Sequence, residues 1–584
     1  MSDGFGPLAT RDGVLFRLWA PSANQVRLLL DGQALPMRAD GGWYSVQVPA
    51  VSDGSSYLFE IDGDLRMPDP GSRFQPDDVH GPSAVAPETY GWRCKDWKGR
   101  PFAEAVFYEL HIGTFTPEGT YRSAIDKLDH LVACGITALQ IMPLSDFPGR
   151  WNWGYDGVLP FAPDSSYGTP DDLKALIDTA HERGLMVFLD VVYNHFGPDG
   201  NYLHGIAREA FSDAQTPWGE AIDYRKTPMR SLVVENVLYW LRDVRFDGLR
   251  FDAVHAIVVP GEPNILAEIS HAAGELARET GRHIHLVLEN DDNAAQWLDP
   301  LRDVPNGRYR AQWNDDYHHA WHVLLTGETA GYYKDYDDAG RRIARSLAEG
   351  FVYQGEASRH RDETPRGEPS AQLSPLAFVN FLQNHDQIGN RALGERLTVL
   401  AKPESLIAAH TILLLAPAPP MLFMGEEWGA REPFPFFCDF KGDLANAVRE
   451  GRKREFAEAY ADSAQDVPDP LAESTFKSAK LDWSVLKVFE HEERLHLTAE
   501  LLRLRREHIV PFVADAKKIN GQARFDTGFL VAAWATETQK LTLIANLSDH
   551  DIDADVPSSK TLIWGGTVPK RLPPWSVYFS IGDR

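Results

Sequence analysis

Residues 246–255, FDGLRFDAVH, decide how the fold is interpreted, because a short apolar run here ends in charged and polar side chains. Arg250 and Asp252 are two positions apart, so in a β-strand both side chains point to one face, while Leu249 and Phe251 point to the other. Ionisable groups at the end of a buried strand are typical of barrels whose active groups lie at the carboxyl ends of the strands.

Seven further strand-like runs flank this one, and amphipathic helical segments separate most of them. The eight runs are 105–115, 136–144, 185–195, 246–255, 283–290, 310–319, 378–386 and 421–428. Strands that alternate with helices predict an α/β fold with a parallel sheet, and eight units fit a (β/α)8 TIM barrel with inserted loops. A doubly wound open sheet is the second choice, but no GxGxxG motif follows the first strand.

Both ends of the chain differ from this pattern. Segments 16–21, 24–32 and 41–49 alternate apolar and polar residues between Gly, Pro and Asp turns, which predicts a small β-sandwich. Short strands return after a last helix that we expect to end at His508. We therefore expect an N-terminal β-sandwich over 1–92, a barrel over 93–508 and a C-terminal β-sandwich over 509–584.

The composition excludes several classes of function. The 584 residues carry 58 Lys and Arg and 84 Asp and Glu, and the resulting charge of −26 repels nucleic acid and anionic membranes. Three widely spaced cysteines argue against a disulfide framework and a zinc site. The N-terminus has no signal-like run, and His410 and three prolines interrupt the apolar stretch 406–424. We expect a cytoplasmic protein with no metal and no cofactor.

Four of the strand-like runs end in groups that suit acid–base chemistry. The run 185–195 ends at Asn194 and His195, 246–255 holds Arg250, Asp252 and His255, 283–290 holds Glu289, and 378–386 ends at His385 and Asp386. A guanidinium beside Asp252 favours the ionised carboxylate that a nucleophile needs. Partial desolvation raises the pKa of a carboxyl such as Glu289 and suits a general acid, and two such carboxyls are the expected pair for glycoside hydrolysis.

Each of these groups alone is more often structural, but four such strand ends in one barrel favour a carboxylate-dependent enzyme. The aromatic residues of 151–157, WNWGYDG, either stack on sugars or fill a loop core. The acids and histidines of 312–319, QWNDDYHH, favour a sugar-contacting loop over a metal site, because no tight ligand spacing is present. Glu426 and Glu427 favour an ion pair at the barrel rim over a catalytic role.

At the four strand ends the sequence resembles the α-amylase superfamily of retaining glycoside hydrolases. DVVYNH, GLRFDAVH, the strand with Glu289 and FLQNHD resemble its four signatures, in the same order. The resemblance implies that Asp252 is the nucleophile, Glu289 the proton donor and Asp386 the stabiliser of the transition state. It also implies an immunoglobulin-like sandwich before the barrel and a β domain after it.

Within that superfamily, FDGLRFDAVHAI, QWNDDYHHAWHVLLTGETAGYYKDY and NHDQIGNRALGERL resemble the maltooligosyltrehalose trehalohydrolases. This resemblance implies cleavage of the α-1,4 bond next to a terminal α,α-trehalose, with release of trehalose, beside a synthase that makes that terminus. The substrate contacts that we expect are Tyr155, His195, Arg250, His255, Asp315, Asp316, His318, His319, Asn384, His385, Gln387 and Gly389. Asp315, Asp316, His318 and His319 are expected to form the leaving-group side. The alternatives are an α-1,4-glucan branching enzyme, an endo-α-amylase and a non-catalytic glucan-binding protein.

Overall fold

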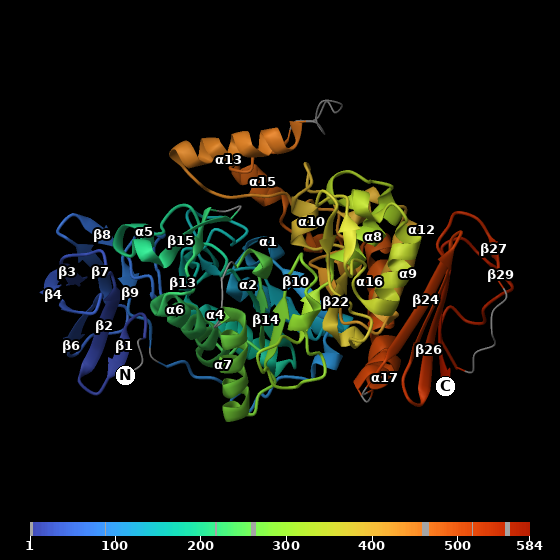
Figure 1. Ribbon diagram of the computed structural model, residues 1–584, viewed down its shortest axis with the longest axis horizontal. Helices are drawn as coiled ribbons and strands as arrows, with labels where there is room; N and C mark the ends of the chain where they lie inside the picture. The colour runs from blue at the N-terminus through green and yellow to red at the C-terminus, as the bar shows by residue number, and fades with distance from the viewer. Residues whose placement is uncertain are drawn as a thin grey trace.

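The computed structural model describes residues 4–87, 89–216, 219–257, 264–457, 467–514, 516, 518–554 and 561–584. Its elements form three units that follow one another along the long axis of the molecule (Figure 1). Two N-terminal sheets lie at one end, a barrel surrounded by helices lies in the centre, and a C-terminal sheet lies at the other end.

The central unit is a closed eight-stranded barrel in which neighbouring strands run parallel. Its strands, in order around the ring, are β10 (Phe107–Leu110), β11 (Ala138–Ile141), β14 (Met186–Val191), β17 (Gly248–Phe251), β18 (His285–Leu288), β19 (Ala311–Trp313), β22 (Phe378–Phe381) and β23 (Pro420–Phe423). Seven of them lie within the runs predicted from the sequence, β23 begins one residue before its run, and the ring follows the order of the chain. The predicted TIM barrel is therefore confirmed.

Capping residues mark the start of α4 and the end of α3 in the barrel. In α4 (Pro170–Glu182) the side chain of Thr169 accepts a hydrogen bond from the Asp172 N–H, and proline occupies the first turn. Gly135 ends α3 (Leu128–Cys134) with φ 105°, a left-handed conformation that glycine adopts without steric strain. These caps fix the direction in which the chain leaves each helix and enters the next strand.

The N-terminal unit contains two antiparallel sheets, with strand orders β1-β2-β6-β5 and β4-β3-β7-β8. Their strands are β1 (Leu8–Thr10), β2 (Gly13–Trp19), β3 (Val26–Leu30), β4 (Gln33–Pro36), β5 (Arg38–Asp40), β6 (Trp43–Val48), β7 (Ser56–Ile61) and β8 (Leu65–Met67), and β9 (Ser83–Ala84) pairs with β7. The predicted strands at 16–21, 24–32 and 41–49 overlap β2, β3 and β6. Alternate residues of β3 are buried, as expected of a sheet with one face on a core.

The C-terminal unit is a five-stranded sheet in the order β24-β25-β26-β30-β28, with a separate pair, β27 and β29. Its strands are β24 (Asn520–Asp526), β25 (Phe529–Ala535), β26 (Gln539–Asn546), β27 (Ile552–Asp553), β28 (Thr561–Trp564), β29 (Arg571–Leu572) and β30 (Val577–Asp583). We propose that the three units correspond to domains over 1–92, 93–508 and 509–584.

The helical segment before this sheet continues beyond His508, where the sequence predicted its end. It consists of α16 (Phe489–Leu504), a π-helical turn (Arg505–Ile509) and α17 (Val510–Ala514), and so it crosses the proposed boundary at 508/509. Ile509, Phe512 and Val513 are buried, so the tertiary core extends the helix further than the local sequence pattern indicated.

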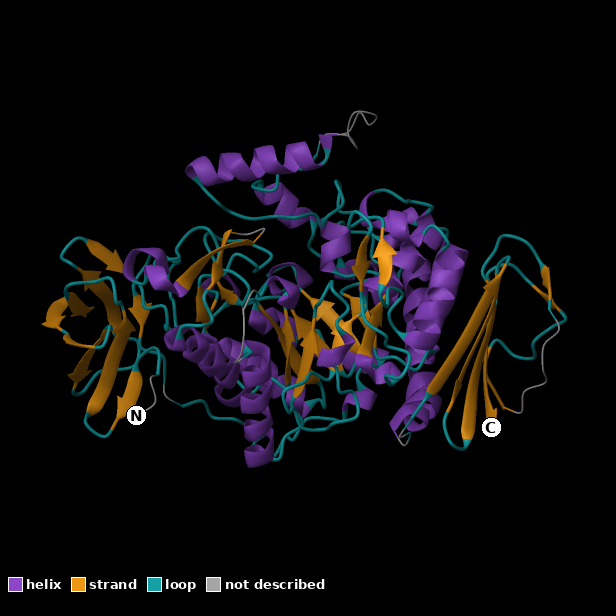
Figure 2. Ribbon diagram, viewed as in Figure 1, coloured by secondary structure: helices purple, strands orange, loops and turns teal. Residues whose placement is uncertain are grey.

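Helices inserted after β23 rise from the carboxyl end of the barrel (Figure 2). They are α13 (Gly442–Glu455) and α15 (Glu473–Ser478). The apolar stretch 406–424 is divided between α12 (Pro403–Leu415) and β23. Within the described ranges, no helix is both long and apolar enough to cross a membrane.

Candidate active site

A cavity of about 580 Å³ opens at the carboxyl ends of the barrel strands. Asp252 follows β17, Glu289 follows β18, and Asp386 lies in α10 (His385–Gly389) after β22; all three line the cavity. Three carboxyl groups from separate strand ends thus meet in one space that is large enough for several sugar rings.

Arg250 connects two of these carboxyl groups, those of Asp252 and Glu289. Its side chain is only 2% exposed, and its Nη1 lies 3.0 Å from Asp252 Oδ1, while its Nη2 lies 2.6 Å from Glu289 Oε2. The same Nη1 lies 2.6 Å from Oδ2 of Asp190 on β14, and the guanidinium lies 4.1 Å from the centre of the Trp313 ring. The delocalised cation therefore fixes the orientation of the two acids while its flat face packs on an aromatic side chain.

Asp252 is held at both carboxylate oxygens. Arg250 binds Oδ1, and the Asn194 side chain donates to Oδ2 at 2.8 Å. Ala253, the next residue, adopts φ 38°, a left-handed conformation that is strained for a residue with a Cβ. The Ala253 N–H donates to Glu289 Oε2 at 2.9 Å, so the backbone that follows Asp252 is hydrogen-bonded to the side chain of Glu289.

Burial changes the ionisation of several carboxyl groups around the cavity. Burial raises the pKa of Glu289, the charge of Asp252 raises it further, and Arg250 only partly opposes this. Burial also raises the pKa of Asp386, and His385 opposes it in part. Burial raises the pKa of Asp190 to about 7 despite its contact with Arg250.

The pKa values of the two histidines at the strand ends shift in opposite directions. Burial lowers the pKa of His195 to about 4, which keeps the ring neutral, and its Nε2 lies 3.0 Å from the carbonyl oxygen of Tyr155. Burial also opposes protonation of His385, but Glu109 on β10 outweighs it and raises the pKa of that ring. Glu109 Oε1 lies 2.6 Å from His385 Nδ1. The contact with Glu109 therefore favours the protonated form of His385, whereas burial favours the neutral form of His195.

Eight of the twelve predicted substrate contacts line this cavity. They are Tyr155, His195, Arg250, His255, Asp315, His319, His385 and Gln387. His319 is 8% exposed, and its Nδ1 is buried without a hydrogen-bond partner among the described residues. Burial raises the pKa of Asp315 well above its usual range, and the charge of Glu289 adds to this.

Asn384 and Gly389 contribute indirectly. The side chain of Asn384 caps α10 by accepting the Asp386 N–H at 2.9 Å. Gly389 packs so closely on Trp153 that an added Cβ would lie 1.9 Å from the indole. These two residues therefore position the helix that carries Asp386 and do not themselves line the cavity.

Asp316 and His318 point into the protein, contrary to the expectation that they face the substrate. The segment 315–319, which we expected to be a loop, forms the first turns of α8 (Asp315–Thr326), where successive side chains are about 100° apart. Asp316 is fully buried and accepts hydrogen bonds from the N–H groups of Val352 and Tyr353 and from the side chains of Asn293, Tyr336 and Arg366. His318 contacts the carbonyl of Leu382 and the Tyr333 hydroxyl.

Replacing Asp316 by alanine is expected to destabilise the barrel by about 3 kcal/mol, because Arg366 and four other donors lose a buried acceptor. Thermal unfolding measures this as a lower melting temperature. The matched control is Asp315→Ala, one residue earlier, which should preserve the melting temperature and raise KM. Equal melting temperatures for the two variants would contradict the role given to Asp316.

The aromatic loop 151–157 and the pair Glu426 and Glu427, which the sequence analysis singled out, differ in their position relative to the cavity. Trp153 and Tyr155 of WNWGYDG line the cavity, whereas Trp151 stacks on Phe476. Glu426 and Glu427 are buried outside the cavity, and Glu427 accepts a hydrogen bond from the Tyr108 hydroxyl at 3.0 Å. No group of three or more His, Cys, Asp or Glu side chains among the described residues is arranged to hold a metal ion.

Sequence reasoning missed several residues of the site. Asp190 and Glu109 each interrupt an apolar strand with an acid, and this signal was available in FLDVV and FYELH. The further cavity residues come from a 3-10 helix (Gly331–Tyr336), from loops and from α13; they are Tyr332, His360, Asn390, Phe436, Arg452 and Glu455. Their segments have no local pattern that relates them to the strand ends.

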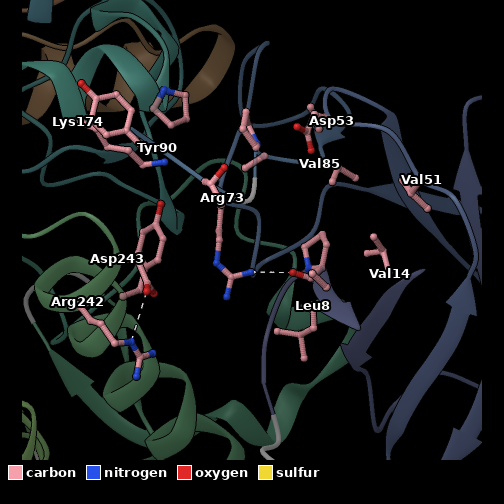
Figure 3. Close-up of a pocket in the computed structure, with 18 of the residues that line it drawn as sticks. Leu8, Val14, Val51, Asp53, Arg73, Val85, Tyr90, Lys174, Arg242 and Asp243 are labelled. Carbon is pink, nitrogen blue, oxygen red and sulfur yellow. Dashed lines mark hydrogen bonds and ion pairs between the residues drawn. The ribbon is translucent and has the colours of Figure 1, made fainter. Parts of the chain in front are cut away.

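A second cavity, of about 560 Å³, lies between the N-terminal sheets and the flank of the barrel (Figure 3). Arg73 extends into it and donates to the carbonyl oxygen of Pro7 at 3.0 Å. Its acids are Asp53 and Asp243, and Asp243 is paired with the neighbouring Arg242. The residues described around this cavity hold no cluster of converging carboxyls, so the chemistry is assigned to the barrel cavity.

Comparisons with known proteins agree with this geometry. Residues 91–220 match the family model of the alpha amylase catalytic domain, and residues 4–72 match carbohydrate-binding module 48, the isoamylase N-terminal domain. A crystal structure of a protein from Salmonella typhimurium superposes with a TM-score of 0.95, at 44% identity over 99% of both chains. A 1,4-alpha-glucan branching enzyme from Leifsonia xyli is 34% identical over 42% of this chain and 37% of its own.

The malto-oligosyltrehalose trehalohydrolase of Deinococcus radiodurans is similar over a far greater length. It is 42% identical over 577 residues, which cover 97% of this chain and 92% of the relative. This similarity agrees with the closed barrel and the three converging acids, and the chain belongs to the malto-oligosyltrehalose trehalohydrolase family.

Proposed function

We propose that this glycosidase hydrolyses the α-1,4 bond next to the terminal α,α-trehalose of maltooligosyltrehalose and releases trehalose, with retention of configuration. The observation that carries the proposal is the convergence of Asp252, Glu289 and Asp386 in one cavity. The chain is also similar to a trehalohydrolase over 97% of its length. The match of residues 4–72 to a carbohydrate-binding module supports an oligosaccharide substrate.

In the first step, Asp252 attacks the anomeric carbon and Glu289 protonates the leaving oxygen. Arg250 and Asn194 each donate a hydrogen bond to one oxygen of Asp252, and together they hold its carboxylate in a fixed orientation. Arg250 and the Ala253 N–H both bind Oε2 of Glu289, which leaves Oε1 to carry the proton. The bond to trehalose breaks, and a covalent glycosyl ester forms on Asp252.

In the second step, Glu289 acts as a base. It removes a proton from water, the water attacks the same carbon, and the ester to Asp252 breaks, so two inversions restore the α configuration. Asp386 is placed to stabilise the positive charge that develops on the sugar in both transition states. Its position is fixed by the Asn384 cap and by the Asn390 side chain, which donates to its Oδ1 at 2.8 Å.

Substrate contacts are assigned to the cavity-lining residues, and the supporting roles go to Asn384, Gly389, Asp316 and His318. Asp315 and His319 line the wall formed by α8, and we assign the leaving trehalose to this wall. The enzyme would act after a synthase that forms the trehalose terminus. The free thiols of Cys94, Cys134 and Cys438 support the cytoplasm as its location.

The pH profile of kcat/KM provides one test of these roles. Glu289 must be protonated to donate, and burial raises its pKa above the ordinary value of 4.5. The rate should therefore persist to a higher pH than an ordinary glutamate permits and then fall as pH rises through that pKa. In Glu289→Gln this basic limb should vanish from the residual activity. A basic limb that is unchanged in the variant would contradict the assignment.

Product analysis tests the function itself. The purified protein is incubated with a maltooligosaccharide ending in trehalose and, separately, with the plain maltooligosaccharide, and chromatography follows free trehalose. We expect rapid release from the first substrate and little change in the second. New α-1,6 links would indicate a branching enzyme, cleavage of the plain chain an endo-α-amylase, and binding without cleavage a non-catalytic protein; each would contradict the proposal.

A further inference from the structure

Helix α13 is an unusual part of the catalytic cavity, because it stands away from the barrel (Figure 1). Among its residues only Ala445 is fully buried, so most of the helix faces solvent. Nevertheless, Arg452 and Glu455 near its end line the cavity together with Phe436 from the preceding loop. A mostly exposed helix thus directs one polar end at the site of reaction.

Arg452 is held in a defined orientation. Its side chain is 15% exposed, its Nη2 donates to the carbonyl oxygen of Gly389 at 2.8 Å, and its Nη1 lies 3.0 Å from Glu455 Oε2. The guanidinium also lies 5.2 Å from the centre of the Phe436 ring. The helix is thereby fastened to α10, which carries Asp386.

The topology determines where this wall lies. In the closed ring, β23, which precedes α13, is separated from β17 by three strands on either side. Arg452 binds Gly389 of α10, which follows β22, so the wall formed by α13 lies on the side of the barrel mouth that carries Asp386. A chain of several sugars that passes over Asp252 can reach both sides of the mouth.

We propose that α13 adds a glucan-binding subsite to the cavity, in which Arg452 donates hydrogen bonds to sugar hydroxyls and Phe436 packs against a sugar face. This inference rests on the proposed function, since it assumes an oligosaccharide substrate. A planar guanidinium offers several donors in fixed directions, and an aromatic ring matches the apolar face of a pyranose. Glu455 supplies an acceptor beside them and holds Arg452 in place.

The test compares Arg452→Ala with Arg449→Ala. Arg449 lies three residues earlier on the same helix, is 38% exposed and pairs with Asp469, outside the cavity lining. For a trehalose-ended substrate with a long glucan chain, Arg452→Ala should raise KM about tenfold with kcat within about twofold, as expected from the loss of a charge-assisted hydrogen bond. Arg449→Ala should leave both constants unchanged within about twofold.

A second variant separates binding from positioning. Phe436→Leu preserves apolar bulk and leaves the contact between Arg452 and Gly389 intact, so it should raise KM severalfold without lowering kcat. Similar constants for Arg452→Ala and Arg449→Ala, or a fall in kcat at constant KM, would overturn the subsite. A wild-type enzyme that cleaves a different α-glucan bond would instead contradict the proposed function, and the same KM comparison would then be made on that glucan.

Discussion

Asp252→Asn is expected to lower kcat on the trehalose-ended substrate by on the order of 10⁴- to 10⁶-fold, the range seen when a covalent nucleophile is removed. The amide cannot form the glycosyl ester, but it preserves the shape of the side chain. Contacts to Arg250 and Asn194 involve both oxygens of the native carboxylate, so the variant keeps one acceptor in place. Substrate binding should therefore persist, which isothermal titration measures directly.

The matched control for this substitution is Asp292→Asn. Asp292 is 57% exposed, pairs with Arg361 at 2.8 Å and lies outside the cavity lining. Its variant should keep kcat within about twofold, as is usual for surface changes. An Asp252→Asn enzyme that retained more than about one-hundredth of the native kcat would remove Asp252 from the role of nucleophile.

Glu289→Gln is expected to lower kcat by about 10²- to 10⁴-fold, since general acid–base catalysis contributes that much. The loss should depend on the leaving group, because a fluoride ion departs without a proton. With an α-maltosyl fluoride, Glu289→Gln should form the glycosyl ester at close to the native rate and then accumulate it. Mass spectrometry of the quenched protein detects the added mass on Asp252.

The α-maltosyl fluoride distinguishes the role of Asp252 from that of Glu289. Asp252→Asn should be inactive toward the fluoride and should show no added mass, because the reactive carboxylate is missing. If Glu289→Gln instead slowed formation of the glycosyl ester from the fluoride as severely as from the trehalose-ended chain, the role of Glu289 would be structural. Its contacts with Arg250 and the Ala253 N–H make that alternative measurable through the melting temperature.

The sequence was sufficient for the barrel because the information is local. Each barrel strand is a short apolar run, and polar groups such as Arg250 and Glu289 appear where the strand meets the cavity. Helix stops such as Gly135 adopt the left-handed conformation that marks a C-cap. The hydrophobic periodicity, the helix caps and the strand ends therefore locate the three acids at the carboxyl ends of barrel strands without any knowledge of tertiary contacts.

The remainder of the site depends on contacts between distant segments. Asp315 and Asp316 are adjacent and chemically identical, yet only the helical twist of α8 decides that the first faces the cavity and the second faces Arg366. Arg452 lies in a charged run, GRKRE, that predicts a solvated surface. Its place in the site follows from its bond to Gly389, 63 residues earlier in the chain, which no local pattern reveals.

Proton NMR tests directly whether the enzyme hydrolyses the bond to trehalose with retention of configuration. The wild-type enzyme acts on a trehalose-ended maltooligosaccharide in the NMR tube. Spectra from the first minutes show both the released disaccharide and the anomeric form of the new reducing end. We expect free trehalose and the α-anomer of the new reducing end to appear together, and the β-anomer to form only later, by mutarotation. Initial formation of the β-anomer, or a new α-anomer without free trehalose, would contradict this expectation.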